Sequence, residues 1–374
     1  MAAIDITPVL KFMVDKGASD LFFSTGAAIH MEIEGDTIPI NAQLMAPGMV
    51  QEIAYSLMSE DQTKEFEREY EMNFAVSRKD IGRFRVNVFR QRGEVGMVVR
   101  HIKTDIPSFE TLGLPPILKE LIMRKRGLLL VVGATGSGKS TTLASMIDYR
   151  NTNSTGHIVT IEDPIEFVHP HKKSVVDQRE VGIDTHSFDN ALKNAMRQAP
   201  DVILIGEVRD MDGMKQAMAY AETGHLCLAT LHANNANQAL ERIISFFPQD
   251  AKAGLLLGLS LNMVGIISQR LIPGTQAKRV AAMEVMINSP YIAELIQKQK
   301  IEEIKEIMAD NNDIGMNTFD QSLFKLFSAG KIDQENALSY ADSRNDLSLK
   351  MRLAAEGSKS SSDGGSGGFG TIIS

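Results

Sequence analysis

Hydrophobic residues in the first hundred positions follow two spacings, which predict a mixture of helices and strands. Between residues 6 and 16, apolar side chains recur at helical intervals, and Gly17 is a natural helix end. Between residues 82 and 89, apolar and polar side chains alternate, which is typical of a half-buried strand. The other expected elements are strands at 19–23, 29–33 and 96–102 and a helix at 51–67. We therefore expect a small α+β domain over residues 1–102.

The pattern changes after residues 103–118, where three prolines and Gly113 form a predicted linker. Beyond it, runs of consecutive apolar residues alternate with helical patterns. The runs cover 128–132, 157–161, 201–205 and 225–231, and the helices between them include 188–198 and 211–222. Uninterrupted apolar strands separated by helices predict a parallel sheet that is buried on both faces. The expected fold class is α/β, in a second domain over residues 119–350.

Helical patterns dominate from residue 236 to about residue 345. The longest apolar stretch, 253–267, contains Ser260 and Asn262, so we interpret it as a buried helix rather than a membrane span. The composition then shifts to Gly and Ser, which predicts a flexible tail over residues 351–374.

Composition narrows the possible functions. The chain has 374 residues, 43% hydrophobic content and a net charge of −8, so it can bury two cores but carries no general attraction for nucleic acid. Its single cysteine, Cys227, excludes a disulfide framework and a cysteine-cluster zinc site. With no basic-then-apolar signal pattern at residue 1, we expect a cytoplasmic protein.

The most specific motif is a GxxxxGK[ST] phosphate loop that directly follows the apolar run 128–132. Glycines let backbone N–H groups surround a polyphosphate, and the following helix presents its positive end to the same anion. Lys139 is expected beside the β- and γ-phosphates, and the Ser140 hydroxyl on Mg²⁺. The predicted nucleotide-binding residues here are Gly133, Ala134, Thr135, Gly136, Ser137, Gly138, Lys139, Ser140 and Thr141.

Acidic and histidine residues lie at the ends of the other apolar runs. Glu207 follows 201–205, where it could orient the attacking water or hold Mg²⁺ through a water; alternatively it is a solvated acid. Three acids including Glu166 surround Pro164 after 157–161, and clustered acids near a triphosphate suit Mg²⁺ or a water that loses a proton. His225 and His232 bracket the fourth run, where either could contact the γ-phosphate or be structural.

Arginines are concentrated in the first domain, at positions 83, 85, 90, 92 and 100. Guanidinium groups bind phosphates in a bidentate manner. A basic strand face is also common as plain solvated surface, so spacing alone leaves both interpretations open.

Together these blocks resemble the type IV pilus retraction ATPases, the PilT/PilU branch of the bacterial secretion-motor ATPases. The resemblance covers nearly the whole chain except the tail. Its blocks are 19–22, 82–87, 133–140, 160–167, 178–182, 201–210 and 221–233. In the family, 133–140 corresponds to the Walker A motif, 160–167 to the Asp box, 201–210 to the Walker B motif and 223–232 to the His box.

The resemblance implies a homohexameric ring with PAS-like N-terminal domains and RecA-like P-loop ATPase domains, using ATP and Mg²⁺. ATP would lie between the two domains. By the same resemblance, Glu166 and Glu207 serve hydrolysis, one of them as the water-activating base, and Arg85, Arg100 and Arg83 reach the phosphates.

Details of the resemblance favour the PilU-like subgroup. Residues 197–201 and 232–244 look PilU-like, and residues 291–298 replace the AlaIleArg-containing helix of the PilT type. This implies a motor accessory to a PilT-type ATPase, at an inner-membrane platform protein of the pilus base. The pilus assembly ATPases are disfavoured because one cysteine cannot supply their four-cysteine zinc motif.

The predicted function is therefore ATP hydrolysis coupled to pilus retraction and twitching motility, with Lys139, Glu166, Glu207, His232, Arg85 and Arg100 as the catalytic set. One alternative is a nucleotide-binding ring subunit that does not hydrolyse ATP and acts as a scaffold for PilT. A second is a nucleic-acid translocase, which the acidic charge balance disfavours.

Overall fold

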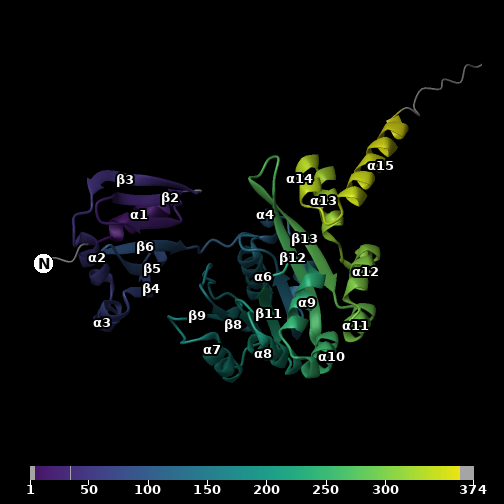
Figure 1. Ribbon diagram of the computed structural model, residues 1–374, viewed down its shortest axis with the longest axis horizontal. Coiled ribbons are helices and arrows are strands. Elements are labelled where there is room, and N and C mark those ends of the chain that lie inside the picture. Colours follow the sequence, from purple (N-terminus) through teal and green to yellow (C-terminus); the bar gives the residue numbers. More distant parts are fainter. Residues whose placement is uncertain (1–4, 34, 363–374) are drawn as a thin grey trace, which may run out of the picture. The chain divides into compact units, whose positions relative to one another are not determined.

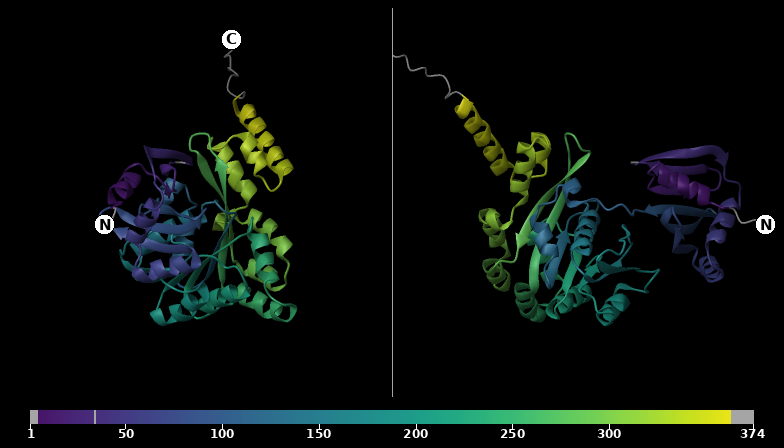
Figure 2. Two further views of the ribbon diagram at one scale, coloured as in Figure 1. Left: turned by 60° about the vertical axis from the view of Figure 1, so that its left-hand side comes forward. Right: turned by 180° about the vertical axis from the view of Figure 1, so that it is seen from behind.

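A computed structural model describes residues 5–33 and 35–362 of the chain (Figure 1; Figure 2). The chain forms two compact units that alternate along the sequence. The first unit comprises the residues up to Ile106 together with Thr155–Pro200, and the second comprises Pro107–Ser154 and the residues from Asp201 onward. Residues 155–200 thus group with the N-terminal residues.

The first unit is built on a six-stranded antiparallel sheet in the order β3-β2-β1-β6-β5-β4. Its apolar face and the helices around it bury a core that includes Leu21, Phe66, Phe84 and Met97. The strands are β1 (Asp20–Phe23), β2 (Ala28–Ile33), β3 (Asp36–Leu44), β4 (Glu71–Arg78), β5 (Gly82–Gln91) and β6 (Glu94–Ile102), and the helices are α1 (Thr7–Asp15), α2 (Met49–Leu57) and α3 (Glu60–Glu69). A parallel pair, β8 (Gly156–Glu162) and β9 (Ser174–Glu180), and helix α7 (Phe188–Ala195) complete this unit.

The predicted helix at 51–67 is wrong in one respect, because it is two helices. The helix is interrupted before Ser59, which is the N-cap of α3 and forms a capping box with Gln62. The predicted helix at 188–198 likewise ends as α7 at Ala195 and continues as a 3₁₀ turn over Met196–Gln198.

The second unit contains parallel strands flanked by helices, as predicted. Strands β10 (Val202–Ile205), β11 (Leu226–Leu231) and β7 (Gly127–Val132) are parallel neighbours, with β12 (Met263–Pro273) parallel to β7 and β13 (Arg279–Ile287) antiparallel to β12. Every residue of β7, β10 and β11 is buried. The helices are α4 (Phe109–Leu112), α5 (Ile117–Ile122), α6 (Lys139–Asn153), α8 (Met211–Glu222), α9 (Ala236–Ser245), α10 (Lys252–Asn262), α11 (Pro290–Gln297), α12 (Ile304–Asp310), α13 (Phe319–Ser328), α14 (Gln334–Ser339) and α15 (Arg344–Ser362). The predicted α/β fold class is confirmed.

Three expectations for this unit differ from the structure. The stretch 253–267 is only partly helical, because α10 ends at Asn262 and β12 begins at Met263. Helices do not dominate 236–345 without interruption, since β12 and β13 form a long hairpin there, in which β-branched Ile266, Ile267 and Ile272 are fully buried. The predicted tail is helical as far as Ser362 in α15, and the remainder of it lies outside the described residues.

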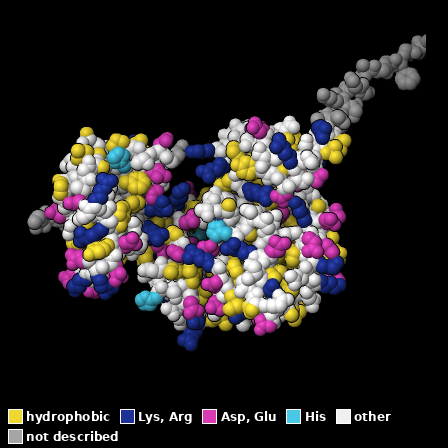
Figure 3. Space-filling view, in the orientation of Figure 1, with side chains coloured by type: hydrophobic (Ala, Val, Ile, Leu, Met, Phe, Trp, Pro, Cys, Tyr) yellow, Lys and Arg dark blue, Asp and Glu magenta, His cyan; other side chains and the backbone are white. Residues whose placement is uncertain are grey.

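The predicted linker is also partly ordered, because α4 and the start of α5 lie within 103–118. No helix among the described residues is long and apolar enough to cross a membrane. On the face shown in Figure 3, acidic and basic side chains are interspersed over the described surface.

Candidate functional site

The phosphate loop connects the end of β7 to the start of α6, which is the strand–loop–helix setting that the motif requires. Two of its glycines are sterically necessary. A Cβ on Gly133 would lie 2.4 Å from the Ser137 Oγ and 2.6 Å from the backbone oxygen of Gln269. Gly138 has a φ of +87°, and a Cβ there would lie 2.8 Å from the Gln269 Nε2. A Cβ at either position would collide with these neighbouring atoms, so only glycine fits there.

The polar side chains of the loop gather at the N-terminus of α6. The Lys139 Nζ donates to the backbone oxygens of Gly133 at 2.8 Å and Ala134 at 3.1 Å, so the ammonium lies across the loop. The Ser137 hydroxyl is buried and has no hydrogen-bond partner within the part of the chain that the structure describes. Ser140 lies in the first turn of α6 at intermediate exposure. A buried orphan hydroxyl, a lysine and a helix N-terminus fit a magnesium-bound polyphosphate.

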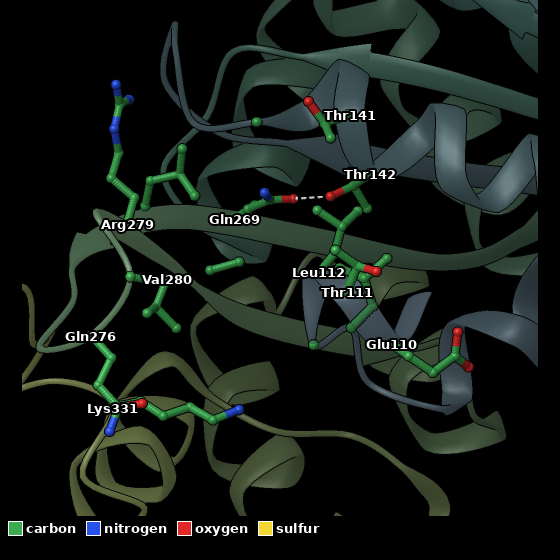
Figure 4. A pocket seen from close by; sticks show the side chains of 16 residues that line it. Glu110, Thr111, Leu112, Thr141, Thr142, Gln269, Gln276, Arg279, Val280 and Lys331 are labelled. Atoms are coloured by element: carbon green, nitrogen blue, oxygen red, sulfur yellow. Dashed lines mark hydrogen bonds between the residues drawn. The ribbon is translucent and has the colours of Figure 1, made fainter. Parts of the chain in front are cut away.

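A cavity of about 410 Å³ lies beside Gly138, Thr141 and Thr142 (Figure 4). Leu112 from α4, Leu271 from β12 and Val280 from β13 give it apolar walls. The Thr142 hydroxyl donates to the Gln269 Oε1 at 2.7 Å on its inner side. An apolar cavity with a few fixed polar groups, next to a phosphate loop, suits a nucleobase. Sequence reasoning missed it because its walls come from distant segments.

A second cavity of about 570 Å³ borders the outer side of the loop, residues 133–137. Asn234, Arg270, Arg279 and Tyr340 contribute to its lining.

Glu207 and His232 lie together at the ends of adjacent strands. The Glu207 Oε1 is 3.2 Å from the His232 Nε2, and its Oε2 accepts from the Arg209 Nε at 2.7 Å. The Glu207 side chain is 23% exposed, so the pair lies in a partly desolvated position. Because β10 and β11 run parallel to β7, both residues lie near the carboxyl ends of these strands, and the phosphate loop begins at the carboxyl end of β7. The sequence named both residues without predicting that they are paired.

His225 lies at the opposite end of β11. Its backbone oxygen accepts from the N–H of Gly127 at 3.0 Å, at the start of β7, and its ring Nδ1 is 3.2 Å from the backbone oxygen of Tyr220. A six-residue strand spans about 20 Å and separates His225 from the loop edge. His225 therefore lies at the end of β11 that is away from the phosphate loop of this chain.

The acids after β8 have different environments. Glu162 is the last residue of β8. The Thr160 hydroxyl donates to its Oε1 at 2.6 Å, and the Gln178 Nε2 donates to the same oxygen at 3.3 Å. Burial raises the pKa of the Glu162 carboxyl to about 7. Glu166, which the sequence favoured, is exposed on the loop that follows Pro164. Glu162 is thus a buried acid with a raised pKa, which the sequence pattern did not single out.

Two of the predicted arginines contact acids at the end of β9 and just after it. The Arg85 Nε is 3.6 Å from the Oε1 of Glu180, whose side chain is 1% exposed, and the Arg83 Nη2 is 4.0 Å from the Asp184 Oδ2. Glu180 also accepts from the Ile165 N–H at 3.3 Å, and burial raises the pKa of its carboxyl. The structure thereby joins β5 to residues 180–184, a pairing that spacing could not predict.

Arg100 contacts a different acid from those that Arg83 and Arg85 contact. Its Nε donates to the Asp20 Oδ1 at 2.8 Å, and this hydrogen bond raises the pKa of the guanidinium. The Arg100 side chain is 64% exposed.

Within the described residues, no group of three or more His, Cys, Asp or Glu side chains could hold a metal ion. Magnesium at the phosphate loop would be held by nucleotide phosphates and waters, with Ser140 as the protein ligand next to them.

The chain is similar to known secretion and pilus ATPases. Residues 2–312 match the family described as "Type II/IV secretion system protein". The chain is 52% identical to the "Type IV pilus ATPase PilU" of Pseudomonas aeruginosa over 94% of this chain and 93% of that protein. It is 42% identical to the "Type IV pilus retractation ATPase PilT" of the same organism over 89% of this chain and 97% of that protein.

A solved structure, the "Pilus Retraction Motor PilT and Bound ADP", superposes with a TM-score of 0.86 at 42% identity, over 92% of this chain and 99% of that one. The Legionella pneumophila ATPase DotB superposes with a TM-score of 0.76 at 25% identity, over 88% of this chain and 92% of that one.

Proposed function

We propose, since this chain belongs to the type II/IV secretion system protein family, that it is an ATPase that drives retraction of a type IV pilus. The single observation that carries the proposal is the position of the Glu207–His232 pair. The pair lies just after the carboxyl ends of two neighbouring strands that run parallel to β7, and the phosphate loop follows the carboxyl end of β7. A loop that binds phosphate and a carboxylate–imidazole pair beside it form a site for hydrolysis as well as binding.

The residues of the loop bind and stabilise the transferring group. Backbone N–H groups of Gly136 and Gly138 and the Lys139 ammonium face the β- and γ-phosphates, and the base enters the cavity near Leu112 and Leu271. Lys139 exchanges its present carbonyl partners for phosphate oxygens. Mg²⁺, held by Ser140 with Glu207 acting through a water, supplies charge neutralisation when bound.

The water is oriented by Glu207, with Glu166 as the alternative acid. The Glu207 carboxylate accepts a hydrogen bond from water as it attacks the phosphorus atom in line with the leaving oxygen. The His232 Nε2 is 3.2 Å from the Glu207 Oε1, so any movement of that carboxylate changes its contact with the imidazole. Arg85, Arg83 and Arg100 supply further positive charge to the phosphates.

The subgroup, the partners and the assembly are assigned by the resemblance of the chain to its family. We assign the chain to the PilU-like subgroup, as an accessory to a PilT-type ATPase at an inner-membrane platform protein. The working assembly is a homohexamer, with a PAS-like domain over 1–102 and a RecA-like domain over 119–350.

The test is phosphate release by the purified protein beside Lys139→Ala and Glu207→Gln. We expect each variant to lose at least about 100-fold in turnover, because each removes an interaction that stabilises the transferring group or the water. Lys125→Ala, an exposed lysine just before β7, is the matched control and should retain full turnover.

Equal phosphate release by the wild type, Lys139→Ala and a buffer blank would leave only a scaffold role. Stimulation of phosphate release by DNA would instead favour a translocase. Twitching of strains that lack this gene, the PilT-type gene or both would test the accessory role, and retraction without any PilT would contradict it.

A further inference from the structure

The loop that carries His232 is fixed to the hairpin β12–β13 at two points. The Arg270 Nη2 donates to the backbone oxygen of Asn234 at 3.3 Å. Two residues further on, the N–H of Ala236 donates to the Glu284 Oε1 at 2.7 Å, and that carboxyl also accepts from the Ser268 hydroxyl at 3.0 Å. The position of His232 therefore depends on side chains that do not touch it.

Arg270 in turn is held by the C-terminal helices. Its Nη2 is 2.7 Å from the Asp342 Oδ1, its Nη1 donates to the backbone oxygen of Tyr340 at 2.8 Å, and its guanidinium lies 3.8 Å from the centre of the Phe319 ring. A planar guanidinium can satisfy these partners at once because its donors are fixed in one plane.

Asp342 is itself part of an ordered turn between α14 and α15. Its N–H donates to the Asp320 Oδ1 at 2.8 Å, and the N–H of Ser343 donates to the Asp320 Oδ2 at 3.0 Å. The Asp342 side chain is 13% exposed and also pairs with the Lys305 Nζ at 2.9 Å. Although burial alone would raise the pKa of Asp342, the hydrogen bond from Lys305 and the charge of Arg270 lower it, so the pair is ionic.

We propose that the Arg270–Asp342 ion pair is a positioning device, which holds His232 opposite Glu207 and makes hydrolysis depend on the docking of the C-terminal helices α13–α15. The inference rests on the proposed function, since it assumes that Glu207 and His232 act in hydrolysis. If the C-terminal helices shift, Arg270 loses three of its contacts, and the backbone of Asn234 loses its anchor. A misplacement of about 1 Å in a group that orients reactants can lower a rate by up to about 100-fold.

The primary variant is Asp342→Asn, which keeps the shape of the side chain and removes its charge. It also lies outside both cavities beside the phosphate loop, so it removes no residue that lines them. We expect kcat to fall about ten-fold while the dissociation constant for ATP stays within two-fold of the wild type. Arg270→Lys keeps the charge but cannot bridge the same partners, and should give a similar loss of kcat. The effects of the two variants should not add in the double variant, because they act on one contact.

The matched control is Lys305→Ala. Lys305 contacts the same carboxylate from α12 but not Arg270, so this variant should keep kcat within two-fold. A direct readout is the ring proton signal of His232 in the NMR spectrum, assigned with His232→Gln. It should shift in Asp342→Asn and not in Lys305→Ala. Thermal unfolding and circular dichroism identify any variant that fails to fold, in which case Asp342→Glu and Arg270→Lys carry the test.

Two results would overturn the inference: a folded Asp342→Asn with unchanged kcat and unchanged His232 signal, or fully additive effects in the double variant. A large loss of ATP affinity in Arg270→Lys with none in Asp342→Asn would assign Arg270 to phosphate binding instead. Failure of the proposed function is distinguishable, because Glu207→Gln and His232→Gln would then leave turnover unchanged.

Discussion

Glu284 is a buried carboxyl whose replacement should change how stability depends on pH. Its side chain is on β13, and the residue is 2% exposed. Burial raises the pKa of this carboxyl to about 7, although the Ala236 N–H and the Ser268 hydroxyl favour the charged form. Glu284→Gln keeps an oxygen for both donors and removes the proton equilibrium.

The magnitude follows from the two protonation equilibria. The unfolded chain binds this proton with the ordinary pKa of 4.5, and the folded chain with a pKa of about 7. Between these values the folded state holds more protons, so the free energy of unfolding falls as pH rises through the window. The whole shift corresponds to about 3 kcal/mol, of which about 1 kcal/mol is lost between pH 6 and pH 8.

The assay is urea unfolding of the wild type and Glu284→Gln at pH 6, 7 and 8, without nucleotide. The difference in the free energy of unfolding between the variant and the wild type should rise by about 1 kcal/mol in favour of the variant from pH 6 to pH 8. Exposed Glu302→Gln serves as the control and should show no such change. A difference for Glu284→Gln that is constant with pH would refute the reasoning.

Three further outcomes are expected at the site. Gly133→Ala should weaken ATP binding at least ten-fold in an equilibrium titration, since its Cβ would lie 2.6 Å from a backbone oxygen that cannot rotate away; unchanged affinity would show that the loop adapts. Thr142→Val should lower the free energy of unfolding by about 1–3 kcal/mol, because it leaves the buried Gln269 Oε1 unpaired, and a loss below about 0.5 kcal/mol in urea unfolding would count against that. Arg85→Gln should destabilise the fold and raise the pKa of Glu180 further, with the loss in urea unfolding larger above that pKa than below it; the opposite pH trend would contradict the ion pair.

Periodicity predicted the elements whose burial is uniform or strictly alternating. Strands β7, β10 and β11 are buried at every residue, so their apolar runs were visible in the sequence. β3 was missed because nearly all of it is exposed, which leaves no alternation to detect. β4 was missed although Met72, Phe74 and Val76 alternate, and that signal could have found it. The helix–strand boundary at Asn262 is invisible within an apolar stretch, since pairing with β7 and β13 decides it.

The site could be predicted only as far as its parts are local. The phosphate loop is a contiguous motif, so its strand–loop–helix setting was predicted correctly. Pairings between distant segments were not predictable: Glu207 with His232, Arg85 with Glu180, and the wall of the base cavity that α4 provides. His225 precedes its strand in the chain, so the sequence already places it away from the carboxyl ends of the parallel strands, which face the ligand in such sheets.

The alternation of the two units along the chain has a consequence for the order in which they are made. The apolar core of the first unit lies within residues 6–99, whereas Arg85 finds its carboxylate at Glu180 and Lys103 forms a bridge with Phe167. During synthesis these two contacts form only after 107–154, which belong to the second unit, have emerged from the ribosome. A fragment that stops at Ile106 would keep the residues of this core and of the six-stranded sheet but leave Arg85 without its acidic partner.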